Sequence, residues 1–479
     1  MINLSLLTPE IIVLITALIV LILDLLPWRG RKVLLATVGV LGTVGALLIT
    51  MGQWDLREEA FYGMVAIDNF SVYFKALFLI ICTLTILLSI NYITRGGIDL
   101  GEYYSLVLLA TFGYMFMASG TDLITIFLAL EILSLAVYIL AGFMRHSPKS
   151  NESAFKYFLL GAFSSAFLLY GIANIYGVVG NTNLKDIAQY LSQEAALKNP
   201  LFLAGMGLLL VGFGFKVAIV PFHMWTPDVY EGSPTTVTAF MAVGTKAASF
   251  AAFLRVFFYT LEPLKGQWVP VLWLLAAVTI IFGNTVAIYQ KNIKRMLAYS
   301  AIAHAGYILV AMVAGNDLGS SSILYYLLVY SLMNLGAFGV VIIVEKKEEE
   351  NLTISDYRGL AYKHPMLSAA MSLFLLSLAG IPPTGGFVGK FYIFSAAVSG
   401  GYVGLAIIGV LGSAIALYYY LRIIVYMYMY DPEKEFLDGP VPFFSAAALV
   451  ITAIGTILLG ITPARILELA HYSISYLGH

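Results

Sequence analysis

Apolar segments long enough to cross a lipid bilayer recur along the whole chain, and no other feature restricts its fold as much. A membrane-spanning helix needs roughly 20 predominantly apolar residues. Hydropathy and length predict about fourteen such segments. They lie at 9–27, 33–50, 68–92, 103–119, 121–143, 153–178, 200–222, 235–260, 268–289, 295–313, 321–344, 366–399, 402–430 and 441–461. Because the connections between them are short, the expected fold is an all-α polytopic membrane protein.

The composition excludes several other classes of protein. Of the 479 residues, 60% are hydrophobic and 11% are charged, whereas soluble domains carry about 25% charged residues. The net charge of −1 offers no basic surface for nucleic acid. The single cysteine, Cys82, lies in an apolar segment, which excludes a disulfide framework and a cysteine-ligated metal cluster. A soluble enzyme, a disordered chain and a nucleic-acid-binding protein are therefore excluded.

Lysine and arginine are distributed unequally between alternate loops. If the loop with Arg29, Arg31 and Lys32 is cytoplasmic, the cytoplasmic loops hold fifteen of these residues, and the outer loops and tail hold five. Cytoplasmic loops of membrane proteins carry such an excess, so both termini are expected on the outer side. The segment 181–199 is expected to form a small amphipathic helix on that side, and the charged run 346–350 a solvated loop end.

A faint internal repeat divides the chain. The heptapeptide FLRVFFY at 253–259 resembles YLRIIVY at 420–426, 167 positions later. In each half, a proline-interrupted span lies one helix before this motif, at Pro221 and at Pro382–Pro383. The repeat unit therefore has about five spans, and an odd number turns successive units upside down, as in inverted-repeat transporters. The predicted parts are N-terminal helices at 1–102, five-helix units at 103–260 and 268–430, and a C-terminal helix with a tail at 431–479.

Basic residues inside the apolar spans require an explanation. A charge at the bilayer centre costs at least about 2.5–3.5 kcal/mol. Those near span ends are expected to extend their head groups to the membrane surface; they are Lys75, Arg255 and Arg422.

Four charged residues lie near the middle of their spans and cannot reach the surface in this way. They are Glu131, Lys216, Lys246 and Lys390. Lys216 and Lys390 lie beside the proline- and glycine-rich interruptions. The segment 366–399 is too long for one straight crossing, so two half-helices with an unwound centre are expected there.

These four residues suggest proton chemistry. Burial disfavours the charged forms of lysine and glutamate, and pairing the two restores those forms. Two charges about 4 Å apart interact by roughly 4 kcal/mol at an effective dielectric constant near 20. Making and breaking a contact between Glu131 and Lys216 would thus load or release a proton on a neighbouring lysine. The alternative is a static buried ion pair between these two residues.

Histidine and hydroxyl side chains add weaker signals. His304 is the histidine that lies well inside a span, where it would bridge Lys246 and Lys390 by proton exchange or serve as a structural core residue. His223 is expected at an interface. Hydroxyl residues beside the charged ones receive no role, because many such groups bond only to the preceding helical turn; they are Ser134, Thr245, Tyr299 and Ser300. We expect no metal site, because the sequence has neither an HxxxH motif nor a carboxylate cluster.

Three segments carry a resemblance to a known family. They read PFHMWTPDVYEGSPTTVTAFM at 221–241, KRMLAYSAIAHAGY at 294–307 and AGIPPTGGFVGKFYIF at 379–394. Together they resemble the antiporter-like membrane subunits of respiratory complex I (NADH-quinone oxidoreductase). The VYEGSP portion and the length resemble subunit N, the relative of mitochondrial NADH dehydrogenase subunit 2. The resemblance covers nearly the whole chain.

The resemblance implies fourteen helices in two inverted five-helix units, with helices 7 and 12 discontinuous. It implies proton translocation coupled to quinone reduction, in the cytoplasmic membrane of a prokaryote and alongside other membrane-arm subunits. It places the family's ionisable residues of helices 5, 7, 8 and 12 on Glu131, Lys216, Lys246 and Lys390. It also implies that partner subunits hold NADH, FMN, iron–sulfur clusters and quinone, and that this chain binds no cofactor.

Other functions remain open at this point. An Mrp-type cation/proton antiporter subunit and a membrane subunit of a hydrogenase share the same scaffold, although the VYEGSP wording favours complex I. A purely structural subunit with an inactive channel is disfavoured by the intact set of four mid-span charges. Co-purifying subunits would discriminate between these functions.

Overall fold

The computed structural model describes residues 3–26, 31–95, 100–193, 196–346, 352–433, 436 and 439–475. Arg29, on which part of the orientation argument depends, lies outside these ranges, as does the charged run 346–350 except for its first residue.

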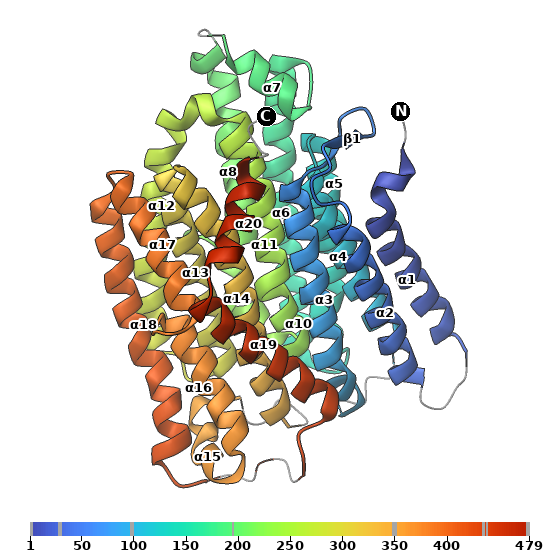
Figure 1. Cartoon of the computed structure of the whole chain (residues 1–479), viewed down its shortest axis with the longest axis vertical. Helices are drawn as coiled ribbons and strands as arrows, with labels where there is room; N and C mark the ends of the chain where they lie inside the picture. The colour runs from blue at the N-terminus through green and yellow to red at the C-terminus, as the bar shows by residue number, and fades with distance from the viewer. Residues whose placement is uncertain are drawn as a thin grey trace.

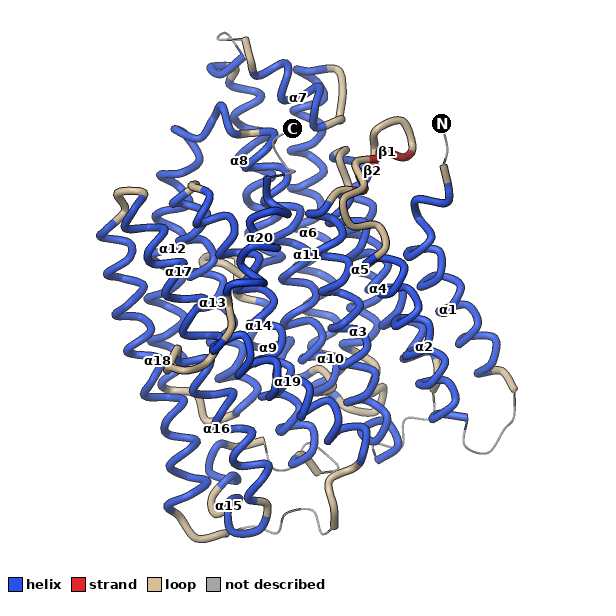
Figure 2. Tube along the Cα trace, in the orientation of Figure 1, coloured by secondary structure: helices blue, strands red, loops and turns tan. Residues whose placement is uncertain are grey.

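The described chain is built almost entirely from helices (Figures 1 and 2). The α-helices are α1 (Thr8–Asp24), α2 (Arg31–Met51), α3 (Asn69–Arg95), α4 (Glu102–Ser119), α5 (Leu123–Ala141), α6 (Pro148–Val179), α7 (Leu184–Leu191), α8 (Pro200–Val217), α9 (Trp225–Gly232), α10 (Thr235–Phe240), α11 (Lys246–Leu254), α12 (Lys265–Ile288), α13 (Ile293–Ala314), α14 (Asp317–Val344), α15 (Leu360–Lys363), α16 (Pro365–Ala379), α17 (Gly385–Ser399), α18 (Val403–Met429), α19 (Phe443–Ile461) and α20 (Ala464–Ser475).

Strands are confined to one small hairpin between α2 and α3 in the described part of the chain. Strand β1 (Glu58–Ala60) pairs antiparallel with β2 (Val65–Ile67). Figure 2 shows the hairpin at the same end of the bundle as the start of α1.

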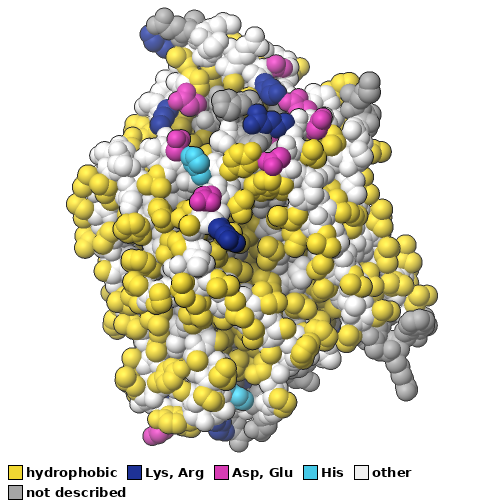
Figure 3. All heavy atoms as spheres, viewed as in Figure 1, with side chains coloured by type: hydrophobic (Ala, Val, Ile, Leu, Met, Phe, Trp, Pro, Cys, Tyr) yellow, Lys and Arg dark blue, Asp and Glu magenta, His cyan; other side chains and the backbone are white. Residues whose placement is uncertain are grey.

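Twelve helical segments in the described ranges are long and apolar enough to cross a membrane. They coincide with twelve of the predicted spans, while α4 occupies 103–119 and the pair α16 and α17 occupies 366–399. The all-helical polytopic class is therefore confirmed. Figure 3 shows the same pattern on one face, where a broad hydrophobic band separates charged side chains near the two ends.

The ends of the bundle carry different elements. Helix α7 confirms the amphipathic helix expected within 181–199. The start of α1, the end of α20 and α7 lie towards one end of the bundle in Figure 1, and α15 lies at the other. Helix α20, in the predicted tail, was not anticipated.

The two interruptions predicted at prolines are present. Helix α8 ends at Val217, and Ala218 follows with a left-handed φ of 62° before the cis peptide Val220–Pro221. Helix α16 ends at Ala379, and Gly380 follows with φ 88° before the cis peptide Pro382–Pro383. Proline lacks the amide hydrogen that a continuing helix needs, so each break frees carbonyl groups in the interior of the bundle.

The expectation that Lys75 and Arg255 extend to the membrane surface is wrong. Lys75 of α3 forms an ion pair with Glu10 of α1 at 2.6 Å, and both side chains are 0% exposed. Arg255 is buried and binds both oxygens of the Asp68 carboxylate, at 2.9 and 3.1 Å. A carboxylate from a distant part of the chain, on α1 for Lys75 and just before α3 for Arg255, satisfies each charge inside the protein. Neither charge therefore needs to reach water.

Arg422 of α18 has a third kind of environment. Its guanidinium donates to the carbonyls of Ile288 and Gln290, at 2.9 and 2.7 Å. These carbonyls belong to the last turn of α12 and the residues after it, where the helix dipole favours a cation.

Candidate functional site

Lys216 lies in the last turn of α8, directly before the first helix break, and is buried. Its Nζ donates to Ser134 Oγ at 2.7 Å and to the Tyr138 hydroxyl at 3.2 Å, both on α5. The same nitrogen lies 5.3–5.9 Å from the ring centroids of Tyr138, Tyr157 and Phe215. Hydroxyls and aromatic faces thus surround this amine, and all of these groups are neutral.

Glu131 lies on α5 one turn before Ser134, at a spacing that places both residues on the same side of the helix. The residue is half-buried, and its Oε1 is buried without a hydrogen-bond partner among the described residues. No ion pair between Glu131 and Lys216 occurs in the described ranges. Lys216 is instead bonded to a hydroxyl one helical turn away from the carboxylate.

Lys246 begins α11, immediately after a π-helical segment at Met241–Thr245. Its buried Nζ donates to the carbonyl of Ala301 on α13 and lies 5.0 Å from the ring centroid of Tyr330 on α14. Single π-helical turns occur frequently at functional sites, because they displace a side chain from the regular helical register.

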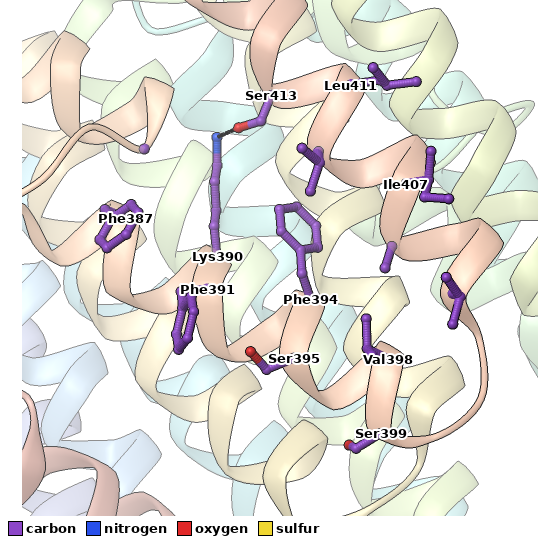
Figure 4. Close-up of a pocket in the computed structure, with 14 residues that line it drawn as sticks. Phe387, Lys390, Phe391, Phe394, Ser395, Val398, Ser399, Ile407, Leu411 and Ser413 are labelled. Atoms are coloured by element: carbon purple, nitrogen blue, oxygen red, sulfur yellow. Dashed lines mark hydrogen bonds between the residues drawn. The ribbon is translucent and has the colours of Figure 1, made fainter.

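Lys390 lies in the second turn of α17, after the second helix break, and is buried. Its Nζ donates to the carbonyls of Leu378 and Ala379, at 2.8 and 3.1 Å, and to Ser413 Oγ on α18 at 2.7 Å. Leu378 and Ala379 end α16, where the partial negative charge of a helix C-terminus favours a cation. Figure 4 shows the lysine reaching Ser413 from below.

A cavity of about 760 Å³ lies beside Lys390, between α17 and α18. Its walls are mainly apolar and include Phe387, Phe391, Ile407 and Leu411, all exposed on the outside of the bundle. Lys390 is the charged residue among the groups that line this cavity (Figure 4).

His304 of α13 lies between Lys246 of α11 and Lys390 of α17. Its ring contacts Tyr330, which faces Lys246, and Tyr307, whose ring centroid is 4.7 Å from Lys390 Nζ. Both ring nitrogens have hydroxyl partners: Nδ1 with Tyr326 at 2.5 Å and Nε2 with Tyr420 at 3.3 Å. The structure therefore brings His304 into one network with Lys246 and Lys390, whereas Lys216 and Glu131 form a separate group.

Several residues of these groups were not identified from the sequence. Ser134 was noted but given no role. Glu131 was the partner predicted for Lys216, and His304 was the link predicted between Lys390 and Lys246. The missed residues are the hydroxyl side chains of Tyr138, Tyr326, Ser413 and Tyr420. Their signal was a tyrosine or serine inside an apolar span, because a buried tyrosine hydroxyl usually has a hydrogen-bond partner.

Acidic residues of the 221–241 segment form ion pairs with basic residues of α6 and α13. Asp228 of α9 forms ion pairs with Lys156 of α6 at 2.8 Å and with Arg295 of α13 at 2.7 Å. Glu231 also contacts Arg295, at 2.9 Å. Burial alone would raise the pKa of the Asp228 carboxyl, but the hydrogen bonds from Lys156 and Arg295 outweigh it and hold that pKa below its ordinary value.

His223, expected at an interface, lies in the turn between α8 and α9. Its ring packs against Phe282 with the centroids 4.7 Å apart, and its Nδ1 is buried without a partner among the described residues. Burial lowers the pKa of this imidazole, and a hydrogen bond with the Pro221 backbone partly opposes the shift. The described ranges contain no group of three or more His, Cys, Asp or Glu side chains placed to hold a metal ion.

Comparisons with known proteins place these features in a family. Residues 120–416 match the family described as NADH:quinone oxidoreductase/Mrp antiporter, TM. The NADH-quinone oxidoreductase subunit N of Trichlorobacter lovleyi is 49% identical over 99% of this chain and 97% of its own length. The chain belongs to the NADH:quinone oxidoreductase/Mrp antiporter family and, within it, to the NADH-quinone oxidoreductase subunit N branch. The resemblance carried by the 221–241, 294–307 and 379–394 segments is thereby confirmed.

Solved structures agree with this assignment. A chain of respiratory complex I from Thermus thermophilus with bound aureothin is 37% identical, with a TM-score of 0.82 over 97% of this chain and 99% of that one. A chain of the Mrp complex from Dietzia sp. has a TM-score of 0.81 at 22% identity, over 98% of this chain and 95% of that one. The second likeness shows the common fold alone.

Proposed function

We propose that this chain is a proton-translocating membrane subunit of a quinone-reducing NADH-quinone oxidoreductase in a prokaryotic cytoplasmic membrane. Electron transfer takes place in partner subunits, which hold NADH, FMN, iron–sulfur clusters and quinone. The other membrane-arm subunits and the lipid bilayer surround this chain, and both of its termini lie on the outer side.

One observation carries this proposal. Lys216 is bonded to neutral hydroxyls while the carboxylate of Glu131, one helical turn away, has a buried oxygen without a hydrogen-bond partner. A static ion pair would instead join the two charges directly. The arrangement supports a lysine with two alternative positions, of which only one neutralises Glu131.

The consequence for proton movement follows from electrostatics. When Lys216 moves to Glu131, the pair stabilises both charges. When Lys216 returns to Ser134 and Tyr138, the Glu131 carboxylate no longer neutralises its positive charge, and that charge disfavours a proton on the next amine. Protons enter from the cytoplasmic side at Lys216 or Lys246, pass by His304 and water to Lys390, and leave on the outer side. The five relay residues are thus Glu131, Lys216, Lys246, His304 and Lys390.

The family description and the fold shared with the Dietzia Mrp complex support a second candidate, a cation/proton antiporter subunit of the Mrp type or of a membrane-bound hydrogenase. The two candidates differ in their partner subunits. Mass spectrometry of the intact, detergent-solubilised complex identifies these directly. Quinone-reductase subunits support the first candidate, and Mrp or hydrogenase subunits support the second.

The test of proton translocation uses the assembled complex in sealed vesicles supplied with its electron donor and quinone. Glu131→Gln preserves the shape of the side chain and removes its charge. We expect the number of protons moved per electron to fall at least about ten-fold, since a positioned acid–base group contributes typically about 10²–10⁴-fold.

Glu152→Gln makes the same chemical change at an exposed site on α6 and serves as the matched control. We expect this control to pump as the native complex does. Native pumping by the Glu131→Gln complex, at native levels of assembly, would overturn the proposed role of the relay.

A further inference from the structure

Two tyrosine hydroxyls from different helices hold the His304 ring at its two nitrogens. Tyr326 of α14 bonds to Nδ1 and Tyr420 of α18 to Nε2, at 2.5 and 3.3 Å. The Tyr420 hydroxyl also bonds to Ser300 Oγ, one turn before His304 on α13. All four side chains are buried, so the hydroxyls and the imidazole form one continuous chain inside the protein.

The hydrogen bonds of this row of side chains all run in the same donor-to-acceptor direction. A neutral imidazole donates a hydrogen bond at one nitrogen and accepts one at the other, while a hydroxyl both donates and accepts. In one polarity, Ser300 donates to Tyr420, Tyr420 donates to Nε2, and Nδ1–H donates to Tyr326. In the opposite polarity every one of these hydrogen bonds is reversed. The hydrogen-bonded side chains are therefore able to pass on a proton, which reverses every hydrogen bond. The hydrogen bonds must return to their first direction before the next proton can pass.

Each end of this hydrogen-bonded chain adjoins, in sequence or in space, a residue that contacts a lysine or precedes one. Ser300 adjoins Ala301, whose carbonyl accepts a hydrogen bond from Lys246 Nζ. Tyr326 lies directly against Gly389, the neighbour of Lys390, where an added Cβ would come within 2.5 Å of the Tyr326 ring. The sequence predicted His304 alone as the bridge, and these contacts extend the bridge in both directions.

We propose that Tyr420 and Tyr326 relay protons between Lys246 and Lys390 through His304, an inference that rests on the proposed function. Ser300 Oγ takes up a proton from the Lys246 side and passes its own to the Tyr420 oxygen. The Tyr420 hydroxyl proton moves to Nε2, the Nδ1 proton moves to Tyr326, and the Tyr326 hydroxyl proton leaves towards Lys390. One proton enters and one leaves, no group ends charged, and the tautomer of His304 changes from Nδ1–H to Nε2–H.

The same tyrosines would also serve as purely structural partners of a buried histidine. The two roles differ in what they predict for proton transfer. A structural partner affects folding and assembly, whereas a relay residue affects the rate of proton movement and its sensitivity to replacing hydrogen by deuterium.

Tyr420→Phe removes the hydroxyl and keeps the ring. Tyr325→Phe is the matched control, because Tyr325 is adjacent to Tyr326, is equally buried and donates to the carbonyl of Leu459 rather than to His304. Proton movement per electron and the solvent deuterium isotope effect are measured on both assembled complexes in vesicles. We expect Tyr420→Phe to lower pumping at least about ten-fold and to raise the isotope effect, while Tyr325→Phe behaves as the native complex does.

Tyr326→Phe removes the hydroxyl at the other end of the hydrogen-bonded row and provides an independent test of the relay if Tyr420→Phe fails to assemble. Native pumping by an assembled Tyr420→Phe or Tyr326→Phe complex would overturn the relay, and so would equal losses in the Tyr325 and Tyr420 variants. A parallel Glu131→Gln measurement separates the two proposals. If that variant loses pumping and both His304-partner variants keep it, the proposed function stands and the tyrosine relay fails.

Discussion

The two broken helices place their lysines in different surroundings. Lys216 comes before its break and bonds to side-chain hydroxyls of a neighbouring helix, α5. Lys390 comes after its break and reaches back to the backbone carbonyls at the end of α16, together with Ser413. The two breaks are otherwise alike, since a left-handed residue follows the end of the first half-helix in each, Ala218 or Gly380.

This difference in hydrogen-bond partners indicates which of the two lysines is better suited to change its position. Backbone carbonyls at a helix end are fixed in place, and their dipoles favour a cation at that point. Hydroxyl side chains on another helix are more easily exchanged for a carboxylate on that same helix. Lys216 therefore fits a switch and Lys390 a fixed terminal site.

Charge removal at the two lysines should have the largest effects. Lys216→Met and Lys390→Met should each lower pumping at least about ten-fold. Only Lys390→Met should also lower thermal stability, because it leaves the carbonyl of Leu378 without its donor, at about 1–3 kcal/mol for an unsatisfied group, while Ala379 keeps a hydrogen bond from Ser413. Vesicle pumping and thermal melting of the purified complex measure the two effects. Equal losses of melting temperature in the two variants would contradict the distinction.

Removing one hydroxyl partner from each lysine should have a smaller and unequal effect. Ser134→Ala deletes a hydrogen bond to a charged group, worth about 1.5–3 kcal/mol, and should shift Lys216 towards Glu131 and slow pumping several-fold. Ser413→Ala leaves Lys390 its two carbonyl partners and should slow pumping less. Initial rates of vesicle acidification provide the measurement. A larger effect of Ser413→Ala would mean that Lys216, rather than Lys390, is the fixed site.

Exchanging the left-handed residues of the two breaks should alter stability by smaller amounts. Ala218→Gly should be neutral or stabilising, because a left-handed backbone costs a residue with a Cβ about 1–2 kcal/mol. Gly380→Ala should cost about the same amount and press on Lys390, since the new Cβ would lie 3.0 Å from its Cδ. Melting curves of the complex test the direction of both stability changes. A stabilised Gly380→Ala complex would contradict the left-handed backbone at Gly380.

The smallest effect is expected at the ion pairs of Asp228, which anchor α9 after the first break. Because the folded protein holds the pKa of this carboxyl below its ordinary value of about 3.9, its contribution is present above that value and is lost as the pH falls through the lowered pKa. Asp228→Asn should lower the melting temperature slightly at neutral pH, as partly exposed pairs contribute about 0.2–1 kcal/mol. The difference from the native complex should shrink below about pH 4. A difference that grows on acidification would contradict this assignment.

Much of the fold followed from local properties of the sequence. The positions of the helices, both proline breaks and the helix within 181–199 were predicted, because apolar length and missing amide donors act within one segment. The π-helical segment that ends at Thr245, directly before Lys246, and helix α20 were not predicted. The π-helical register has no local sequence signal of comparable strength.

The candidate site was predictable only in part. Glu131, Lys216, Lys246 and Lys390 stood out because a charge within an apolar span is costly wherever its partners lie. The partners of the buried charges could not be identified in this way. Ser134 is 82 positions from Lys216, and Asp68 is 187 positions from Arg255, another buried charge. The same lack of long-range information led to the wrong expectation for Lys75, whose carboxylate partner lies on α1.

The sequence by itself determined that this is a multi-spanning membrane protein and which of its residues carry charge into the apolar interior. These properties depend on the cost of moving each residue out of water, and that cost is set by the residue and its immediate neighbours. Only the tertiary structure decided which charges are neutralised by ion pairs, which are bonded to hydroxyls, and which histidine nitrogens meet a tyrosine. Such pairings depend on distances of about 3 Å between helices far apart in the chain, and helix packing alone brings those groups together.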